Sequence, residues 1–244
     1  MHDNSKAVGI VAEIRHFPVK SMAGETVDQV HIGWHGLAGD RRFAFMKTNC
    51  DSGLPWLSGR ELTTLLTYSA KLEDARDENS AIHVSIPGGT VVSLRDEELR
   101  KNLENLSGSP LQLVRLWRGT FDSMPISLIT TSSIEAIAKT IAIRPDILRY
   151  RPNIVIKALD SRSYPEDRWI GELLVFGETA DSARIRIARK DVRCSIVNFD
   201  PCTGETNPEI LREIAMNRKN MLGVYGITER PGRVRVGDLI RIER

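Results

Sequence analysis

Hydrophobic and polar positions alternate over short runs along most of this chain, and turn-forming residues separate the runs. The runs are rich in β-branched and aromatic residues, with Gly, Pro and Asp between them. This pattern is typical of a β-rich fold. It predicts strands at 9–17, 26–32, 43–48, 65–72, 82–86, 91–94, 111–117, 153–157, 173–176, 183–188, 195–199, 224–228, 234–236 and 239–242.

A helical spacing replaces the alternation in a few segments. The leucines of 96–106 recur at three- and four-residue intervals behind an acidic first turn, which predicts a helix. Further helices are predicted at 132–141 and 208–217. Asn207 is suited to cap the last of these, and Pro208 suits its first position.

A break in the pattern divides the chain. Ser107-Gly108-Ser109-Pro110 ends the first helix and separates a predicted N-terminal domain at 1–106 from a second domain at 110–244. A chain of 244 residues can hold one large core or two small ones. Many strands with few helices in the second part predict an antiparallel barrel. The expected fold class is therefore β-rich α+β, with a C-terminal antiparallel β-barrel preceded by a smaller β-rich N-terminal domain.

Composition narrows the functional classes. A hydrophobic content of 41% and a charged content of 27% are ordinary for a globular protein, and a net charge of +2 indicates neither a nucleic-acid nor a membrane partner. No uncharged apolar stretch reaches the roughly 20 residues of a membrane span, and the first residues lack the apolar run of a signal peptide. The odd, small number of cysteines favours a reducing compartment, so we expect a cytoplasmic protein.

The cysteines carry the most specific chemistry. Cys50, Cys194 and Cys202 form no CxxC pair and no Cys/His set with zinc spacing. Cys194 follows the cationic segment Arg189-Lys190-Asp191-Val192-Arg193, and cationic neighbours stabilise a thiolate. A thiolate suits a soft or high-valent metal centre. The alternative, which the spacing alone favours, is that Cys194 is an ordinary small buried residue.

Three further motifs could bind an anion. Pro18-Val19-Lys20-Ser21, at a strand exit, offers an ammonium and a hydroxyl group. In Gly39-Asp40-Arg41-Arg42, alternation along the following strand allows one arginine to face inward. Tyr150-Arg151-Pro152-Asn153 offers a guanidinium for a phosphate and an amide for the edge of a heterocycle. Taken alone, the first motif is better explained as an ordinary exposed turn, and a structural ion pair is the alternative for the last.

Taken together and in order, these motifs resemble the MOSC family, named for the C-terminal domain of molybdenum cofactor sulfurases. The first two motifs resemble the β-barrel-like N-terminal domain that often precedes it, so the resemblance covers nearly the whole chain. The matching segments are Pro18-Val19-Lys20-Ser21, Gly39-Asp40-Arg41-Arg42, Arg151-Pro152-Asn153-Ile154-Val155-Ile156, Arg193-Cys194, Asp200-Pro201-Cys202-Thr203-Gly204 and Pro231-Gly232-Arg233-Val234-Arg235-Val236-Gly237-Asp238.

The resemblance implies a cofactor and its ligands. Members related to the mitochondrial amidoxime reducing component bind a molybdenum–pterin cofactor (Mo-molybdopterin), and the cysteine of the Arg-Cys motif ligates the metal. That residue here is Cys194, which is thereby the implied metal ligand and catalytic residue. The implied cofactor-binding residues are Lys20, Ser21, Arg41, Arg151, Asn153, Arg193 and, from a further matching stretch at Asp122-Ser123-Met124-Pro125, Ser123.

The implied activity is that of an oxidoreductase that reduces small N-hydroxylated or N-oxide substrates. Since the chain has too few cysteines for an iron–sulfur cluster of its own, the electrons are expected from a separate ferredoxin- or flavoprotein-type donor. Two alternatives stay open. One is a carrier of molybdenum cofactor or sulfur that uses a Cys194 persulfide. The other is a scaffold that has lost its cofactor. The chain departs from the family at Cys202, where the Asp-Pro-x-Thr-Gly turn commonly has an acidic residue.

Overall fold

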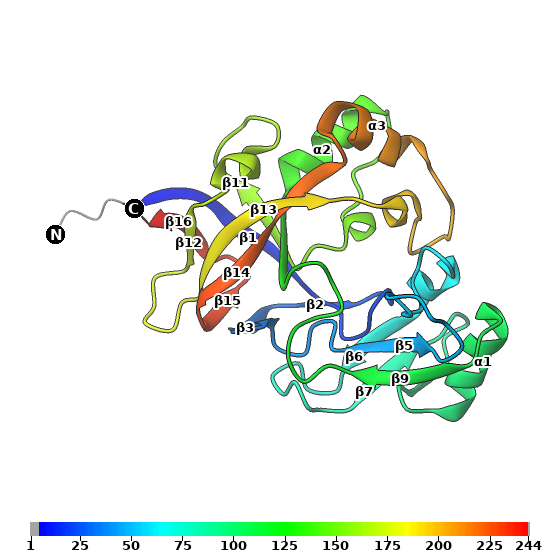
Figure 1. Ribbon diagram of the computed structural model, residues 1–244. Helices are drawn as coiled ribbons and strands as arrows, with labels where there is room; N and C mark the ends of the chain where they lie inside the picture. The colour runs from blue at the N-terminus through cyan, green and yellow to red at the C-terminus, as the bar shows by residue number, and fades with distance from the viewer. Residues whose placement is uncertain (1–4, 244) are drawn as a thin grey trace.

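A computed structural model describes residues 5–243, and its largest element is an eight-stranded sheet (Figure 1). The strand order is β11-β10-β14-β13-β12-β16-β1-β2, and β1 also pairs with β11, which joins two distant strands of this series. The strands are β1 (Lys6–His16), β2 (Glu25–Val27), β10 (Ile126–Thr130), β11 (Ile154–Ala158), β12 (Leu173–Phe176), β13 (Arg184–Val192), β14 (Met221–Arg230) and β16 (Leu239–Glu243).

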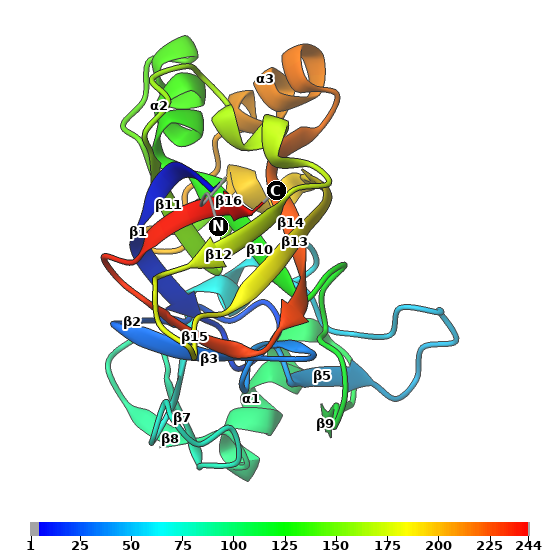
Figure 2. The ribbon, with the colours of Figure 1, turned by 90° about the vertical axis from the view of Figure 1, so that its left-hand side faces the viewer.

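Smaller sheets and short helices surround the large sheet (Figures 1 and 2). The smaller sheets are β15 (Gly232–Arg235) with β3 (Gln29–Gly33) and β4 (Gly36–Leu37), β5 (Phe43–Lys47) with β9 (Leu111–Arg115), and β6 (Ser69–Leu72) with β7 (Ile82–Ser85) and β8 (Val91–Ser93). The helices are α1 (Glu97–Ser107), α2 (Thr131–Thr140) and α3 (Glu209–Arg218), with 3₁₀ turns η1 (Thr63–Thr67), η2 (Leu148–Tyr150), η3 (Pro165–Trp169) and η4 (Ser195–Asn198). No helix within residues 5–243 is long and apolar enough to cross a membrane.

Three hydrophobic clusters stabilise these sheets and helices. The first fills the large sheet and includes Leu128 and Ile154, which are both fully buried. A second lies between α1 and the strands β5 to β9, and a third packs α2 and α3 with η2 and η4. α1 begins where the Asp96 carboxylate accepts the backbone N–H groups of Glu98 and Leu99, and it ends at Gly108 with φ of 66°. The predicted first helix is therefore confirmed.

Local pattern misassigned a few segments. The segment 195–199, predicted as a strand, is mostly the 3₁₀ turn η4, and the first half of the predicted strand 65–72 belongs to η1. β10 was not predicted, since it is buried at every position and leads directly into α2, so no alternation marks it. It also runs parallel to β11, because α2 lies in the connection between the two strands. The structure is β-rich, but its large sheet is not wholly antiparallel.

Strand pairings cross the boundary predicted from sequence. β1, from the N-terminal segment, pairs with β11 and β16 in the large sheet. β9, which follows the predicted boundary, pairs with β5. The division into 1–106 and 110–244 stays a prediction. Strands of each segment, however, form hydrogen bonds with strands of the other. As a result, residues far apart in the sequence meet where the large sheet contacts the β5–β9 region.

Candidate functional site

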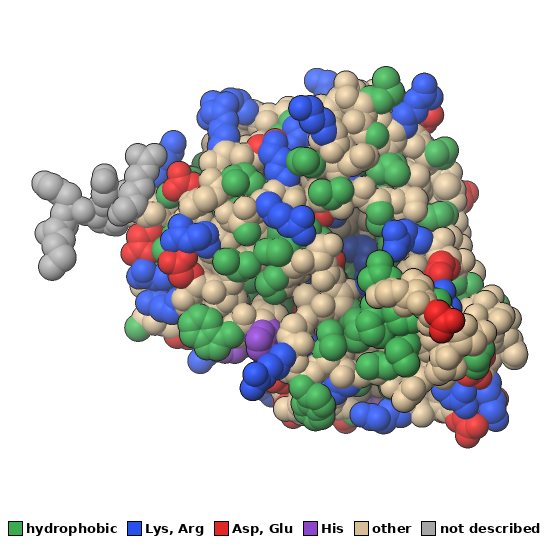
Figure 3. All heavy atoms as spheres, in the orientation of Figure 1, with side chains coloured by type: hydrophobic (Ala, Val, Ile, Leu, Met, Phe, Trp, Pro, Cys, Tyr) green, Lys and Arg blue, Asp and Glu red, His purple; other side chains and the backbone are tan. Residues whose placement is uncertain are grey.

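A cavity of about 600 Å³ lies where these parts of the molecule meet. Its walls come from the loop after β1, the loop before β10, η2, the end of β13 with η4, and β14. The surface in Figure 3 is hollowed, with a Lys or Arg side chain deep in the hollow and hydrophobic side chains beside it. A volume of this size is typical of sites for cofactors and small ligands.

The lining carries an excess of positive charge. Six cationic side chains line the cavity (Lys20, Arg41, Arg60, Arg149, Arg151 and Arg193) against two carboxylates, Asp122 and Asp191. Within residues 5–243, Lys20, Arg60 and Arg151 have no carboxylate within 4.0 Å. Burial lowers the pKa of Lys20, whose ammonium group donates to the carbonyl of Phe121 at 2.8 Å. An anionic ligand would therefore relieve an existing charge imbalance.

The Arg41 guanidinium is buried and held by four neighbours. Nη1 donates to Oδ2 of Asp40 at 2.6 Å and to Oδ1 of Asn153 at 3.1 Å. Nη2 donates to the carbonyl of Arg151 at 2.8 Å, and Nε lies 3.1 Å from Oδ2 of Asp122. Burial by itself lowers the pKa of Arg41, but Asp40 and Asp122 outweigh it and the pKa is raised. Arg41 thus stays charged and joins segments from both halves of the chain.

Arg151 is a buried cation of the lining that has no carboxylate within 4.0 Å among residues 5–243. Its Nη2 donates to the carbonyl of Met22 at 2.7 Å, and its guanidinium lies 4.5 Å from the centre of the Phe17 ring. Burial, followed by the nearby charge of Arg41, lowers the pKa of Arg151 to about 9. Cys194 lies close enough to influence the same pKa. Arg151 is therefore suited to pair with an anion beside the thiol.

Backbone conformation also marks this cavity. Ser21, Arg41 and Arg151 have φ of 63°, 47° and 50°, and they are among seven non-glycine residues with positive φ in residues 5–243. Each such residue costs on the order of 1 kcal/mol and persists only where its surroundings hold it. Strained residues of this kind gather at binding and catalytic sites, so their concentration here supports a functional cavity.

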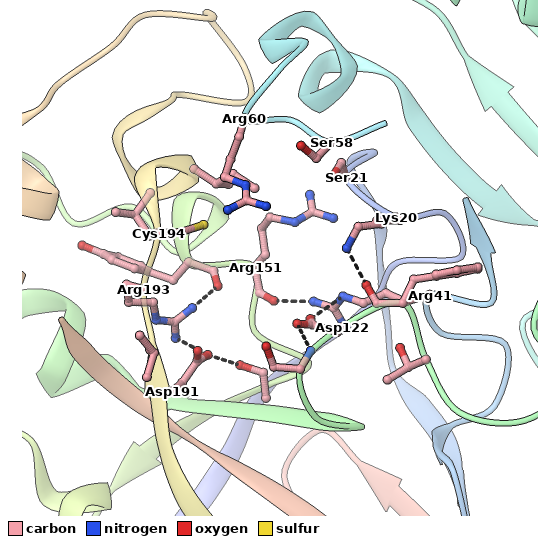
Figure 4. Close-up of a pocket in the computed structure, with 18 of the residues that line it drawn as sticks. Lys20, Ser21, Arg41, Ser58, Arg60, Asp122, Arg151, Asp191, Arg193 and Cys194 are labelled. Atoms are coloured by element: carbon pink, nitrogen blue, oxygen red, sulfur yellow. Dashed lines mark hydrogen bonds and ion pairs between the residues drawn. The ribbon is translucent and has the colours of Figure 1, made fainter. Parts of the chain in front are cut away.

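Cys194 is the exposed thiol of the lining, directly after β13 and before η4 (Figure 4). The cationic residues that precede it in sequence have other partners. Lys190 donates to Asp167 at 2.7 Å, and the Arg193 guanidinium donates to two backbone carbonyls at 2.7 Å each. Lys190 and Arg193 are therefore held by other elements, and their effect on the thiol stays a prediction. Arg151 is a further cation of the lining, and it lies close enough to Cys194 for the two charges to interact.

A model of the MOSC domain matches residues 108–241 of this chain. The chain belongs to the MOSC family. This confirms the resemblance inferred from motif order. MOSC domains are associated with binding of the molybdenum cofactor. Within the matched range lie the thiol, Arg151 and the carboxylates of the lining.

Several solved structures are similar to this MOSC protein. The YuaD protein from Bacillus subtilis has 14% identity and a TM-score of 0.48, over 98% of this chain and 97% of that one. YiiM from Geobacillus stearothermophilus has 16% identity and a TM-score of 0.38, over 49% of this chain and 54% of that one. YiiM from Escherichia coli has 13% identity and a TM-score of 0.34, over 52% and 57%. No curated protein sequence matches the chain, so the family assignment depends on the family model.

In this MOSC protein the cavity brings together most of the residues predicted from sequence. The lining includes Lys20, Ser21, Arg41, Ser123, Arg151, Arg193 and Cys194. Asn153 is not among the lining residues and is buried behind Arg41. Its Oδ1 accepts from the Arg41 guanidinium and from the backbone N–H of Ser127 at 3.0 Å. Its place is that of a residue that orients Arg41.

Sequence reasoning missed several lining residues, among them Arg60, Asp191 and Tyr225. Asp191 stands inside the segment that drew attention to Cys194, but a single acidic residue among cations resembles an ordinary ion pair. Arg60 and Tyr225 belong to no motif, and nothing local distinguishes them. Only the fold shows that they face the same cavity.

An apolar wall completes the cavity. Leu54 and Val192, which both line it, are 67% and 55% exposed. Beside them, the rings of Trp56 and Phe121 meet edge to face with their centres 4.7 Å apart. Exposed apolar side chains at a cavity that is otherwise cationic favour a ligand with both an anionic and an apolar part.

Proposed function

We propose that this MOSC protein binds Mo-molybdopterin in the cavity and reduces small N-hydroxylated or N-oxide substrates with electrons from a separate donor. One observation carries the proposal: an exposed thiol, Cys194, shares a single cavity with cations that have no carboxylate partner within the described range 5–243. A cofactor that combines a thiophilic metal with a phosphate matches both features.

The donor set fits this cofactor better than it fits a simple metal site. No group of three or more His, Cys, Asp or Glu residues among residues 5–243 could hold a metal ion. One thiol alone is a poor site for a free ion, but it is sufficient for a metal that is already held by an organic ligand. The unpaired charges of Lys20, Arg60 and Arg151 then have a counterpart in the phosphate.

The side chains have separable roles in this proposal. Cys194 ligates the molybdenum, while Lys20, Ser21, Arg60 and Arg151 bind the anionic end of the cofactor. Arg41, Asn153 and Arg193 act mainly by holding the loops of the cavity, since their hydrogen-bonding groups are engaged with protein. Ser123 lines the rim next to Asp122 and is a further contact. When bound, the cofactor supplies the two-electron chemistry, and the protein supplies binding, orientation and charge neutralisation.

The electron donor is proposed to be a ferredoxin- or flavoprotein-type protein in the cytoplasm, where thiols stay reduced. A second candidate function follows from the exposure of Cys194. An exposed thiol beside Arg151 could also carry a persulfide, which is how a carrier of cofactor or sulfur would use it.

Metal analysis tests the binding proposal. Protein produced in a host that makes the cofactor is expected to contain molybdenum and a fluorescent pterin in equal amounts. Cys194→Ser should abolish molybdenum retention without unfolding the protein, since the side chain is exposed. Cys202→Ser is the matched control. Both cysteines are exposed, but burial and Asp200 raise the pKa of Cys202, which disfavours its thiolate. Loss of metal in the control, with retention in the Cys194 variant, would contradict the assignment.

Turnover separates the reductase from the carrier. Metal-loaded protein supplied with an amidoxime and a chemical reductant should form the amidine. If loaded protein gives no product with any N-hydroxylated compound, but mass spectrometry finds a persulfide on Cys194, the carrier function is the better explanation. A folded protein with neither metal nor pterin, and with no persulfide on Cys194, would refute both.

A further inference from the structure

We propose that Asp191 is the proton donor of this site, and that Tyr225 and Asp122 return a proton to it after each turnover. The inference rests on the proposed function and adds to it the residue that protonates the oxygen leaving the substrate. Three neighbouring side chains of the cavity lining, Asp191, Tyr225 and Asp122, have no role in the proposed binding of the cofactor.

Asp191 is a buried carboxyl that still faces the cavity. Its residue is 2% exposed, and it belongs to β13, close to the strand end that carries Cys194 (Figure 4). The hydroxyl of Ser127 donates to Oδ2 at 3.1 Å, and Nη2 of Arg193 lies 2.9 Å from the same oxygen. Both of these contacts fall on Oδ2, so Oδ1 is the oxygen that can carry a proton.

Tyr225 lies between the two carboxyl groups of this part of the cavity. The hydroxyl of Tyr225 donates to Oδ1 of Asp122 at 3.2 Å and is also a hydrogen-bond partner of Asp191. A phenol has a single proton, so it can donate to only one of the two carboxyl groups at a time. It donates to Asp191 when that carboxyl is ionised, and in the proposed resting state it donates to Asp122 while a protonated Asp191 donates to it.

The surroundings push the two carboxyl groups in opposite directions. Burial raises the pKa of Asp191, although Arg193, just beyond the end of β13, opposes it. Asp122 raises this pKa further, while Ser127 and Tyr225 lower it. Burial alone would raise the pKa of Asp122 as well, but Arg41, the backbone N–H of Ser123, Lys20 and Tyr225 together outweigh it, and the pKa is lowered. Two carboxyl groups whose environments separate their pKa values are the usual basis of an acid and its proton acceptor.

Asp122 connects Tyr225 and Asp191 with solvent, because its side chain is partly exposed. The side chain of Asp122 is 27% exposed, whereas that of Asp191 is 3% exposed. A proton taken from cavity water at Asp122 can pass through the hydroxyl of Tyr225 to Asp191. The guanidinium of Arg189 lies 5.6 Å from the centre of the Tyr225 ring and is the further charge that faces these three side chains.

The reaction is a two-electron, two-proton reduction of the N–O bond. A substrate with an N–OH group takes up two electrons from the ferredoxin- or flavoprotein-type donor and two protons. The N–O bond breaks, the nitrogen keeps its remaining substituents with an added hydrogen, and the oxygen leaves as water. Asp191 gives the departing oxygen one of these protons and becomes a carboxylate, and the second comes from solvent. Asp122 and Tyr225 then restore the proton on Asp191.

Asp191→Asn tests the proposal, because the amide keeps the size of the side chain and an acceptor for Ser127 and Arg193. We expect unchanged molybdenum and pterin contents, a fall in kcat of about 100-fold or more, and loss of the alkaline limb of the pH–rate profile. Asp191→Glu should recover part of the activity. Tyr225→Phe should lower kcat by a smaller factor and leave metal content unchanged.

Titration of the carboxyl group gives a readout that is independent of turnover. In cofactor-free protein labelled with carbon-13 in its aspartates, the signal missing from Asp191→Asn should titrate at a higher pH than an ordinary aspartate. A signal that stays ionised throughout the neutral range would overturn the inference.

The outcomes distinguish this inference from the proposed function. If loaded wild-type protein has no reductase activity, the proposed function is wrong. Asp191 then has no leaving oxygen to protonate, so this inference is wrong as well. If wild type is active and Asp191→Asn keeps its activity and pH profile, only the present inference fails. A variant that loses thermal stability but keeps an unchanged pH profile would show a structural ion pair instead.

Discussion

Replacing Arg151 by methionine should make the cofactor-free protein more stable while it destroys the site. The guanidinium is surrounded by Arg41, the Phe17 ring and the cavity, and within residues 5–243 it has no carboxylate within 4.0 Å. A charge held in such surroundings costs folding free energy, and an apolar side chain of similar length avoids that cost. Methionine can pack on the Phe17 ring in the same space.

The magnitude follows from the pKa. Burial and Arg41 lower the pKa of Arg151 from 12.5 to about 9. At about 1.36 kcal/mol per pKa unit, this sets an upper bound of roughly 5 kcal/mol on the destabilisation. Water in the cavity screens part of it, and the carbonyl of Met22 loses a hydrogen bond worth about 1 kcal/mol. We therefore expect a net gain of about 1–2 kcal/mol in the free energy of unfolding.

Urea denaturation of cofactor-free protein at neutral pH measures this gain, and molybdenum analysis of the same variant measures the loss of binding. Arg95→Met is the matched control, since Arg95 is exposed and lies outside the cavity; its effect should stay within about 0.5 kcal/mol. If Arg151→Met lowers the free energy of unfolding by 1 kcal/mol or more, the cation supports the fold. The Arg151 guanidinium would then be a structural cation, and its lack of a carboxylate partner would not indicate an anion-binding role.

The remaining predictions concern the metal ligand and the core. Cys194→Ser should lose molybdenum while Cys202→Ser keeps it, as metal analysis will show. Burial raises the pKa of Glu166, so the stability that this group contributes is fully present below its unfolded pKa and is lost as pH rises through its folded pKa. Glu166→Gln should therefore match wild type in urea denaturation at acid pH and exceed it at alkaline pH; an equal difference at both pH values would contradict this. Leu128→Ala, at a fully buried position of β10, should cost about 2–5 kcal/mol, and a shift of less than 1 kcal/mol would mean that the sheet core tolerates the cavity.

Local physics in the sequence determined much of this protein. Alternation located most strands, because it records which face of a strand is buried. The cap at Asp96 and the glycine at 108 determined the ends of α1. The order of short motifs was enough to indicate the family, which the match to residues 108–241 confirms. It also singled out seven residues that line one cavity.

The tertiary structure decided which of these residues have free hydrogen-bonding groups. Arg193 is adjacent to Cys194 in sequence, but its guanidinium is used by backbone carbonyls, whereas Arg151 approaches the thiol from η2. Asn153 carries a motif amide, yet it is buried behind Arg41. The spacing of hydrophobic residues in the sequence indicates only which face of a strand or helix is buried. The partner of a charged side chain depends on which distant segments the strand pairings bring together, and here those pairings join β1 and β9 to opposite halves of the chain.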